Sequence, residues 1–448
     1  MSPEAAAPAF RRPTTWVLPV VAVSVVMSLL AALYLGGILD PKENLRHFPV
    51  ALVVSDEGDV LPNGEQANLG QQIGQGIADG IDAEKIDLKQ VGIAEAQNLL
   101  ANGDVYGAIV VPSDFTKRVS ILTQASVVAG DIERPIVTIM TNPRAGTLGS
   151  SLMTTIGDTA LDSANGTLGE RLTTQVTEAL PAGATLSGAA ALTLAAPVDI
   201  VVTPYDPLPD GTGLGLSAFY YALLLVLAGF TGAMIASALV DSALGFVPLE
   251  FGPTFLQRRR STDSRLRVLA AKWLTMVVIG FVVSGLYVAI ATALGMPIPN
   301  ALGLWLFGVL AISAVGITAV SVLSIFGTPG LILNLVVFVI LGLPSAGATI
   351  PIQASPALFG WLAQFEPMHQ VYLAVRSILY FDSRWNSGLA HGLGMTLLGL
   401  VIGLVLGALV IAIYDRKGYD RTPAVTGSPG DEPEGLVDDV AERSAGGE

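Results

Sequence analysis

Residues 273–365 decide the fold, because no side chain in this run of 93 residues is charged. The run reads WLTMVVIGFVVSGLYVAIATALGMPIPNALGLWLFGVLAISAVGITAVSVLSIFGTPGLILNLVVFVILGLPSAGATIPIQASPALFGWLAQF. Turn signals interrupt it at residues 296–300 (MPIPN) and 327–330 (GTPG). Since about 20 apolar residues in a helix cross a hydrocarbon core of about 30 Å, we predict three membrane spans here. They lie near residues 273–295, 302–326 and 331–350.

Three further uncharged runs bring the expected number of spans to six, arranged as one plus five. Residues 16–39 form 24 residues without a charge. We interpret them as an uncleaved anchor, because a secretory signal has an apolar stretch of only about 7–15 residues before a cleavage site. A second span follows within residues 211–240, and the last lies within residues 388–414. Residues 211–414 are therefore predicted to form a five-span membrane domain.

The composition supports this interpretation and excludes several classes of protein. Hydrophobic residues make up 52% of the chain and charged residues 13%, about half the charged fraction of a soluble protein. The chain has no cysteine, which excludes disulfides and thiolate metal sites. The sequence has no clustered basic face of the kind that binds nucleic acid. We expect a polytopic helical membrane protein in contact with a lipid bilayer, with no nucleic-acid partner.

The basic residues predict the orientation of the spans. Arg11 and Arg12 lie in the N-terminal segment 1–15, six basic residues lie in the loop 241–272, and Arg416 with Lys417 follow the last span. With six spans all three groups fall on one side, which the positive-inside rule assigns to the cytoplasm. We therefore predict a multi-pass protein of the cell (plasma) membrane with both termini cytoplasmic. The tail 415–448, rich in Gly, Pro and acidic residues, is expected to be disordered.

Residues 40–210 are predicted to form an extracytoplasmic α/β domain, because strand-like and helix-like patterns alternate along them. The expected strands are residues 49–54, 86–91, 107–111, 135–141 and 198–203. The expected helices are residues 66–81, 94–101 and 113–122, and residues 147–179 are expected to form one or two more. Acid groups such as Asp56, Glu57 and Asp59, or Asp79 and Asp82, could bind a cation, but in a domain with 22 acidic residues a solvated surface is the favoured interpretation. No nucleophile and base stand out as a pair, so we expect neither an enzyme nor a cofactor.

Three stretches resemble the YhgE/Pip (phage infection protein) family among the type 2 ABC exporter permease-like proteins. The first is residues 102–115 (NGDVYGAIVVPSDF), similar to the turn, strand and P-x-D-F motif of that family. The second runs from Asp206-Pro207 to Ala218-Phe219-Tyr220. The third runs from Phe359-Gly360-Trp361 through Phe365-Glu366-Pro367 to Tyr372 and Arg376. The resemblance implies that residues 351–387 form two short outward helices before the last span.

The resemblance also implies a function. It predicts a permease subunit of an ABC-type exporter, a homodimer that moves an amphipathic or cell-envelope substrate outward. The chain has no G-x-x-x-x-G-K-[ST] motif, so an ATPase would be a separate subunit. Arg258, Arg259, Arg260 and Arg265 then form a helix that docks the ATPase, or they merely satisfy the positive-inside rule. The alternative function is a non-transporting scaffold or receptor that acts through the α/β domain.

Three sets of residues in and near the predicted spans are candidates for packing or function. Gly399, Gly403 and Gly407 form a stripe of small residues, either a dimer seam or a packing surface within the block. Asn334 is an amide deep in an apolar span, for which an interhelical hydrogen bond is favoured over a role in a substrate path.

Glu366, His369 and Arg376 form the third set, with His391 predicted nearby. They lie at the outer boundary of the predicted membrane domain and could act there as a proton-sensitive gate. A plain interfacial contact is the favoured interpretation.

Overall fold

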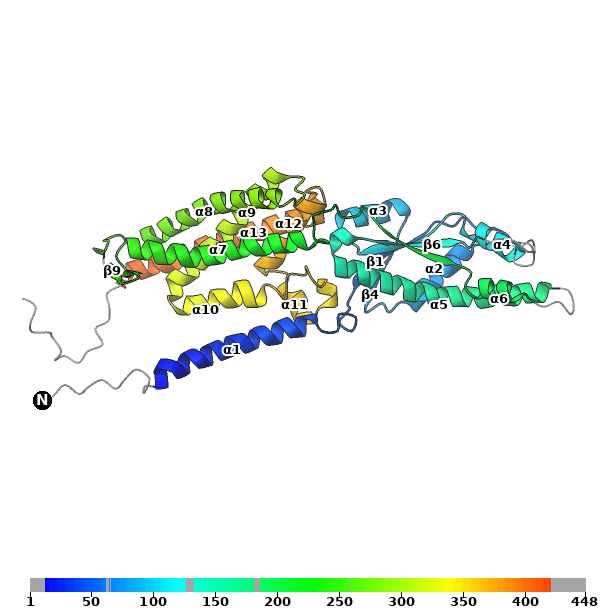
Figure 1. The fold of residues 1–448 in the computed structure, drawn as a ribbon, viewed down its shortest axis with the longest axis horizontal. Coiled ribbons are helices and arrows are strands. Elements are labelled where there is room, and N and C mark those ends of the chain that lie inside the picture. The colour runs from blue at the N-terminus through cyan, green and yellow to red at the C-terminus, as the bar shows by residue number, and fades with distance from the viewer. Residues whose placement is uncertain are drawn as a thin grey trace, which may run out of the picture.

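The structure is a computed structural model that describes residues 13–419 except 62, 63, 65, 126–132, 181–185 and 257. An α/β domain and a helical block lie end to end (Figure 1). Most of the predicted N-terminal segment 1–15, with Arg11 and Arg12, and nearly all of the predicted disordered tail 415–448 lie outside the described residues.

Five helices in the described residues are long and apolar enough to cross a membrane. Each has 26 to 29 residues, or about 40 Å at 1.5 Å per residue. They are α1 (Pro13–Ile38), α7 (Leu216–Ala243), α8 (Arg265–Ala293), α9 (Ala301–Phe326) and α13 (Leu389–Arg416). The described chain therefore has the helices of a polytopic membrane protein.

The predicted span at residues 331–350 is not one long helix. Helix α10 (Pro329–Leu335) has seven residues and continues into six residues of π-helix, η3 (Val336–Leu341). Together they extend only about 20 Å. Pro344, which has no backbone N–H, and Gly347, whose φ is +69°, follow directly and prevent a longer regular helix.

The chain nevertheless returns along the whole block between α9 and α13, because these two helices run in the same direction. Thr318 of α9 lies against Gly403 of α13, and further along both helices the Tyr414 hydroxyl donates to the Ile325 carbonyl at 3.5 Å. The return path uses α10, η3, an irregular segment, η4 (Ile352–Ala354), α11 (Ala357–Leu362) and α12 (Pro367–Tyr380). At the far end Asn300, the N-cap of α9, donates to Ser383 at 3.0 Å.

The α/β domain contains a five-stranded sheet with the order β4-β1-β5-β6-β7. Its strands are β1 (Phe48–Val54), β4 (Ile86–Gln90), β5 (Gly107–Val111), β6 (Ile136–Thr141) and β7 (Asp199–Pro204). All neighbours are parallel except β5 and β6, where Ile109 faces Ile139 across an antiparallel pair. Each strand begins and ends within one residue of the predicted range.

Helices cover the two faces of the sheet unequally. The larger core includes Phe48, Leu52, Ile109 and Ile139 from the strands, and a smaller cluster with Ala51 lies on the opposite face. Four helices contribute to the larger core: α2 (Leu69–Gly80), α4 (Phe115–Ala125), α5 (Thr147–Ala179) and α6 (Gly188–Ala195). Only α3 (Ile93–Asn102) contributes to the smaller one. Neighbouring residues of one strand, such as Ala51 and Leu52, belong to different cores because successive side chains of a strand point to opposite faces of the sheet.

Candidate functional site

Polar side chains gather at the two ends of the helical block. The loop end comprises residues 241–264, the start of α8 and the end of α13, and lies away from the α/β domain (Figure 1). The domain end comprises residues 342–388, which meet η2 (Pro143–Ala145) of the α/β domain.

At the loop end a buried ion pair joins α7 to α8. The Lys272 ammonium lies 2.8 Å from an Asp241 carboxylate oxygen, and the two side chains are 3% and 18% exposed. A lysine that is nearly free of water contact needs such a counter-charge. Lys272 therefore stabilises the block, unlike the exposed arginines of the same loop.

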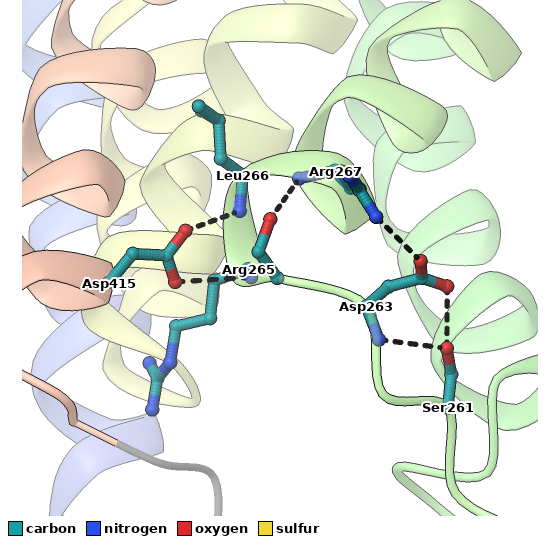
Figure 2. A network of polar contacts seen from close by, with 7 residues as sticks. Ser261, Asp263, Arg265, Leu266, Arg267 and Asp415 are labelled. Carbon is teal, nitrogen blue, oxygen red and sulfur yellow. Dashed lines mark hydrogen bonds and ion pairs between the residues drawn. The ribbon is translucent and has the colours of Figure 1, made fainter.

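Asp415, at the end of α13, binds the first turn of α8 (Figure 2). Its carboxylate oxygens accept from the backbone N–H groups of Arg265 at 3.2 Å and Leu266 at 3.1 Å. Ser264 is the N-cap and accepts from the Arg267 N–H at 3.3 Å. A carboxylate at a helix N-terminus satisfies unpaired N–H groups and opposes the positive end of the helix dipole. These contacts fix the start of α8 relative to the end of α13.

The four predicted docking arginines divide into two pairs. Arg258 and Arg259 are exposed. The Arg260 guanidinium lies 5.5 Å from the centre of the Phe246 ring, and that of Arg265 lies 5.8 Å from the Tyr414 ring. Arg260 and Arg265 also line one open cleft of about 640 Å³. Arg260 and Arg265 thus lie against aromatic rings, although Arg260 is exposed like Arg258 and Arg259.

The loop before α8 is not the docking helix that the resemblance implied. Its described residues form a hairpin of β8 (Leu249–Phe251) and β9 (Thr254–Leu256), followed by a segment without regular structure up to Ser264. Gly252, with a φ of +57°, and Pro253 explain the turn, because they are typical turn residues and poor helix formers. The exposed Phe255 gives the hairpin an apolar side chain next to the arginines.

At the domain end two arginines bridge the α/β domain and the helical block in both directions. Arg144 of η2 donates from Nη1 to the Tyr380 carbonyl of α12 at 2.8 Å. Arg376 of α12 donates from Nη1 to the Ala145 carbonyl of η2 at 3.1 Å. Arg144 also forms an ion pair with Asp206 at 2.6 Å. Because neighbouring residues of η2 meet α12 in this way, the bridge fixes the domain relative to the block.

Further contacts continue this junction on either side of the arginines. The Tyr380 hydroxyl accepts from the Ala218 N–H at 3.2 Å at the start of α7. Gly103, which ends α3 with a φ of +74°, packs so closely that an added Cβ would lie 2.9 Å from the Phe381 ring. Tyr106 of the domain donates to Gln353 at 3.1 Å. The α/β domain and the helical block therefore share a tightly packed, hydrogen-bonded interface.

The predicted gate residues do not converge on one point. His369 and Arg376 line a cleft of about 400 Å³ at the domain end, together with His391. The His369 Nδ1 atom is hydrogen-bonded to the Ala346 carbonyl at 2.8 Å, and burial lowers its pKa to about 4. His369 is therefore neutral at neutral pH.

Glu366 lies outside this cleft and caps α12. Its Oε2 accepts from the Met368 N–H at 2.6 Å, while the buried Oε1 has no hydrogen-bond partner. An added Cβ on Gly342, just after the π-helix, would lie 3.0 Å from Oε1. Burial raises the pKa of Glu366 to about 8, although the N–H groups of Met368 and His369 oppose the shift. Glu366 therefore holds a proton over most of the neutral range.

Asn334 and the glycine stripe are placed in helix packing. The Asn334 side chain is buried and donates to the Ala319 carbonyl of α9 at 3.0 Å. An added Cβ on Gly403 would lie 2.3 Å from Thr318, and one on Gly407 would lie 2.5 Å from Ser321. Gly399 is different, since an added Cβ there would meet nothing within 4 Å. Two of the three glycines thus allow α13 to approach α9 within the same chain.

Among the described residues of the α/β domain, Asp56 is one of the acids considered as a cation ligand. Asp56 binds the backbone: its oxygens accept from Gly70 N at 2.9 Å and from Thr116 N at 3.0 Å. Among the residues that the structure describes, no group of three His, Cys, Asp or Glu side chains could hold a metal ion.

Comparison with known proteins identifies the family but not its activity. Residues 19–403 match a family described as Protein of unknown function (DUF3533). The chain belongs to this family. A comparison with curated proteins finds no match. Because DUF3533 has no assigned function, the resemblance to YhgE/Pip and the exporter function stay predictions.

Sequence reasoning missed the residues that organise both ends. Arg144, Tyr380 and Asp415 have their roles only because distant segments meet. One signal was present for Asp415: it is the first acid after an apolar run and lies next to Arg416 and Lys417. For Arg144 the only signal was its position shortly after a predicted strand.

Proposed function

We propose that this member of DUF3533 is the membrane permease subunit of an ABC-type exporter, working with a separate ATPase to move an amphipathic or cell-envelope substrate outward. In this proposal the loop end is cytoplasmic and the α/β domain is extracytoplasmic. The chain crosses the cell membrane six times, and residues 327–351 make the fifth crossing as a short helix followed by irregular chain.

The observation that carries the proposal is the exposed pair Arg258 and Arg259 at the loop end. The polar groups around them are engaged within the chain: Lys272 with Asp241, and Asp415 with the start of α8. The described basic loop lies at the end of the block opposite the α/β domain (Figure 1), as the positive-inside rule requires of a cytoplasmic loop. Two exposed guanidinium groups on a fixed base suit an acidic surface of an ATPase.

Two other features favour the same function. Helices α11 and α12 are short and lie at the domain end, in the position that the resemblance to type 2 permeases implies. An added Cβ on Gly399 would meet nothing within 4 Å, which leaves room for a second copy of the chain in a homodimer. In this arrangement Gly403 and Gly407 pack within the chain and only Gly399 belongs to the dimer seam.

Co-purification with an ATPase tests the proposal. Arg258→Gln together with Arg259→Gln should weaken the association, because two groups that can form forked hydrogen bonds to carboxylates are lost. Arg384→Gln is the matched control, since Arg384 is exposed at the domain end. Full-length variants in detergent are compared for ATPase recovery and ATP hydrolysis. Equal recovery of all variants would remove the docking role, and the absence of any ATPase partner for the native chain would overturn the exporter function.

A second candidate is a scaffold or receptor that acts through the α/β domain. The observation that favours it is the edge strand β7, where Val201 and Val202 are 38% and 44% exposed. Unpaired backbone groups on an edge strand can accept a strand of another protein. This function would be favoured if the native chain binds another protein but no ATPase, and if the Val202→Lys variant no longer binds that protein.

A further inference from the structure

Arg376 is a buried cation whose hydrogen-bonding capacity is only partly used. The side chain is 9% exposed. Its Nη1 donates to the Ala145 carbonyl, but its buried Nε has no hydrogen-bond partner. Among the described residues no carboxylate lies within ion-pair distance of it. Arg376 thus lines the cleft as a cation without a carboxylate partner among the described residues.

The surroundings of Arg376 stabilise its charge only in part. Its Cζ lies 5.6 Å from the centre of the Tyr372 ring and 5.4 Å from that of Phe381. Such contacts favour a guanidinium in this place. They supply no negative charge, however, and a buried cation without a counter-charge costs free energy that an anion in the cleft would offset.

The cleft beside Arg376 has the size and chemistry of a ligand site. Its volume of about 400 Å³ falls within the range of about 300–1,000 Å³ that is typical of small-molecule sites. Its walls come from both parts of the chain, with Tyr106 from the α/β domain and His369, Tyr372 and His391 from the block. Burial raises the pKa of Tyr106 to about 12 and also raises that of Tyr372, so both phenols keep their protons.

One acidic residue lines the cleft. Asp104 is exposed, and partial burial raises its pKa while the charges of Lys89 and Arg376 oppose the shift. Its carboxylate therefore senses Arg376 without forming an ion pair with it. An anion in the cleft would be attracted by Arg376 and repelled by Asp104. Substitutions of these two residues should therefore change its affinity in opposite directions.

We propose that this cleft binds a phosphate ester, with Arg376 as its principal ligand and the Tyr372 hydroxyl and the His391 imidazole as further donors. A phosphate group offers three oxygens in different directions, whereas a carboxylate offers two in a plane. The donors here lie on walls from different segments, which suits the phosphate. Both a lipid headgroup and a free phosphorylated compound carry this group. The site is proposed for the chain itself and does not depend on the exporter function.

Calorimetric titration of the full-length protein in a neutral detergent tests the site. The probes are dihexanoyl phosphatidic acid, glycerol 3-phosphate and inorganic phosphate, with dihexanoylglycerol as the control that lacks the phosphate. We expect the phosphatidic acid to bind and dihexanoylglycerol not to bind. Binding of the phosphatidic acid alone identifies a lipid headgroup as the source, and equal binding of glycerol 3-phosphate identifies a free compound.

Two variants assign the binding to the cleft. Arg376→Lys keeps the charge but loses Nε, and should weaken binding at least about tenfold. Asp104→Asn removes the repelling carboxylate from an exposed position and should strengthen binding severalfold. If the thermal midpoint shows that Arg376→Lys does not fold, the binding affinity of Asp104→Asn tests the proposal instead. The proposal is wrong if the native chain binds none of the phosphate probes, or if the folded variants bind them as the native chain does.

Discussion

The loop end and the domain end of the helical block both carry arginines, but they hold them in different ways. At the loop end side-chain carboxylates neutralise Lys272 and cap α8, and Arg258 and Arg259 are left exposed. At the domain end Arg144 and Arg376 donate to backbone carbonyls across a junction. The loop end is therefore held together by its own ion pair and helix cap, and it leaves positive charge exposed. The domain end uses its charge to join two parts of one chain.

The comparison also separates charge that can be predicted from charge that cannot. A cluster of arginines in a loop is visible in the sequence, and the positive-inside rule uses it to predict on which side of the membrane the loop lies. A single buried arginine is visible only in the structure, because its partners are backbone atoms from a distant segment. The arginines of the domain end should therefore be more sensitive to substitution than the exposed Arg258 and Arg259 of the loop end.

The largest expected effect is the pH dependence of stability caused by Glu366 at the domain end. The unfolded chain releases this proton near the usual pKa of 4.5, and the folded protein only near pH 8. Between these pH values the folded protein binds more protons than the unfolded chain. Raising the pH from 5 to 9 should therefore lower the free energy of unfolding by roughly a few kcal/mol. Above the folded pKa the loss is complete.

Glu366→Gln tests this prediction, because the amide cannot ionise yet its oxygen can still accept from Met368. Thermal midpoints of the detergent-solubilised proteins are compared from pH 5 to pH 9. We expect the native midpoint to fall and that of the variant to stay flatter. Parallel curves would show that Glu366 is not the group responsible.

The next largest loss of stability is expected for substitution of Lys272, because this residue of the loop end is buried. Lys272→Met leaves Asp241 without its counter-charge in a largely buried place and should cost about 2–4 kcal/mol. The double variant Lys272→Met with Asp241→Asn should recover part of this loss, since no charge is then left unpaired. Chemical denaturation in detergent measures both, and a single variant as stable as the native chain would contradict the buried ion pair.

A somewhat smaller effect is expected for Arg144 at the domain end. Arg144→Ala removes the hydrogen bond to the Tyr380 carbonyl and the partly exposed ion pair with Asp206, and should cost about 1–3 kcal/mol. The exposed Arg258→Ala at the loop end is the control and should change stability by less than about 0.5 kcal/mol. Similar losses of stability in Arg144→Ala and Arg258→Ala would contradict the view that the domain end holds its arginine in place and the loop end leaves its arginine exposed.

The smallest effect separates two carboxylates of the loop end that Figure 2 shows together. Asp415→Asn weakens the capping of α8 and should cost about 0.5–2 kcal/mol. Asp263→Asn removes an exposed contact with Arg267 at 3.8 Å and weakens an exposed hydrogen bond from Ser261, and should cost about 0–0.5 kcal/mol. Thermal midpoints measured side by side distinguish the two, and an equal response would exclude a capping role for Asp415.

The fold was predictable from the sequence wherever a local pattern controls it. Uncharged runs gave the long helices, and the short aliphatic run at residues 107–111 gave strand β5. Residues 331–350 were harder, because an apolar run does not show that Pro344 and a π-helical turn divide it. For the candidate sites, the sequence named Arg376 and His369 with His391 nearby, but it could not show that Tyr106 of the α/β domain lines the same cleft. That grouping depends on contacts between segments far apart in the chain.

Cysteine labelling at Thr328 and Asn386 tests the central claim most directly, namely that residues 327–351 carry the chain across the membrane between α9 and α13. Both residues are exposed, and the chain has no cysteine of its own. In intact cells an impermeant thiol reagent should label Asn386→Cys, while Thr328→Cys should label only after lysis. Labelling of both positions under the same condition would contradict the six-crossing arrangement and the assignment of the two ends to opposite sides of the membrane.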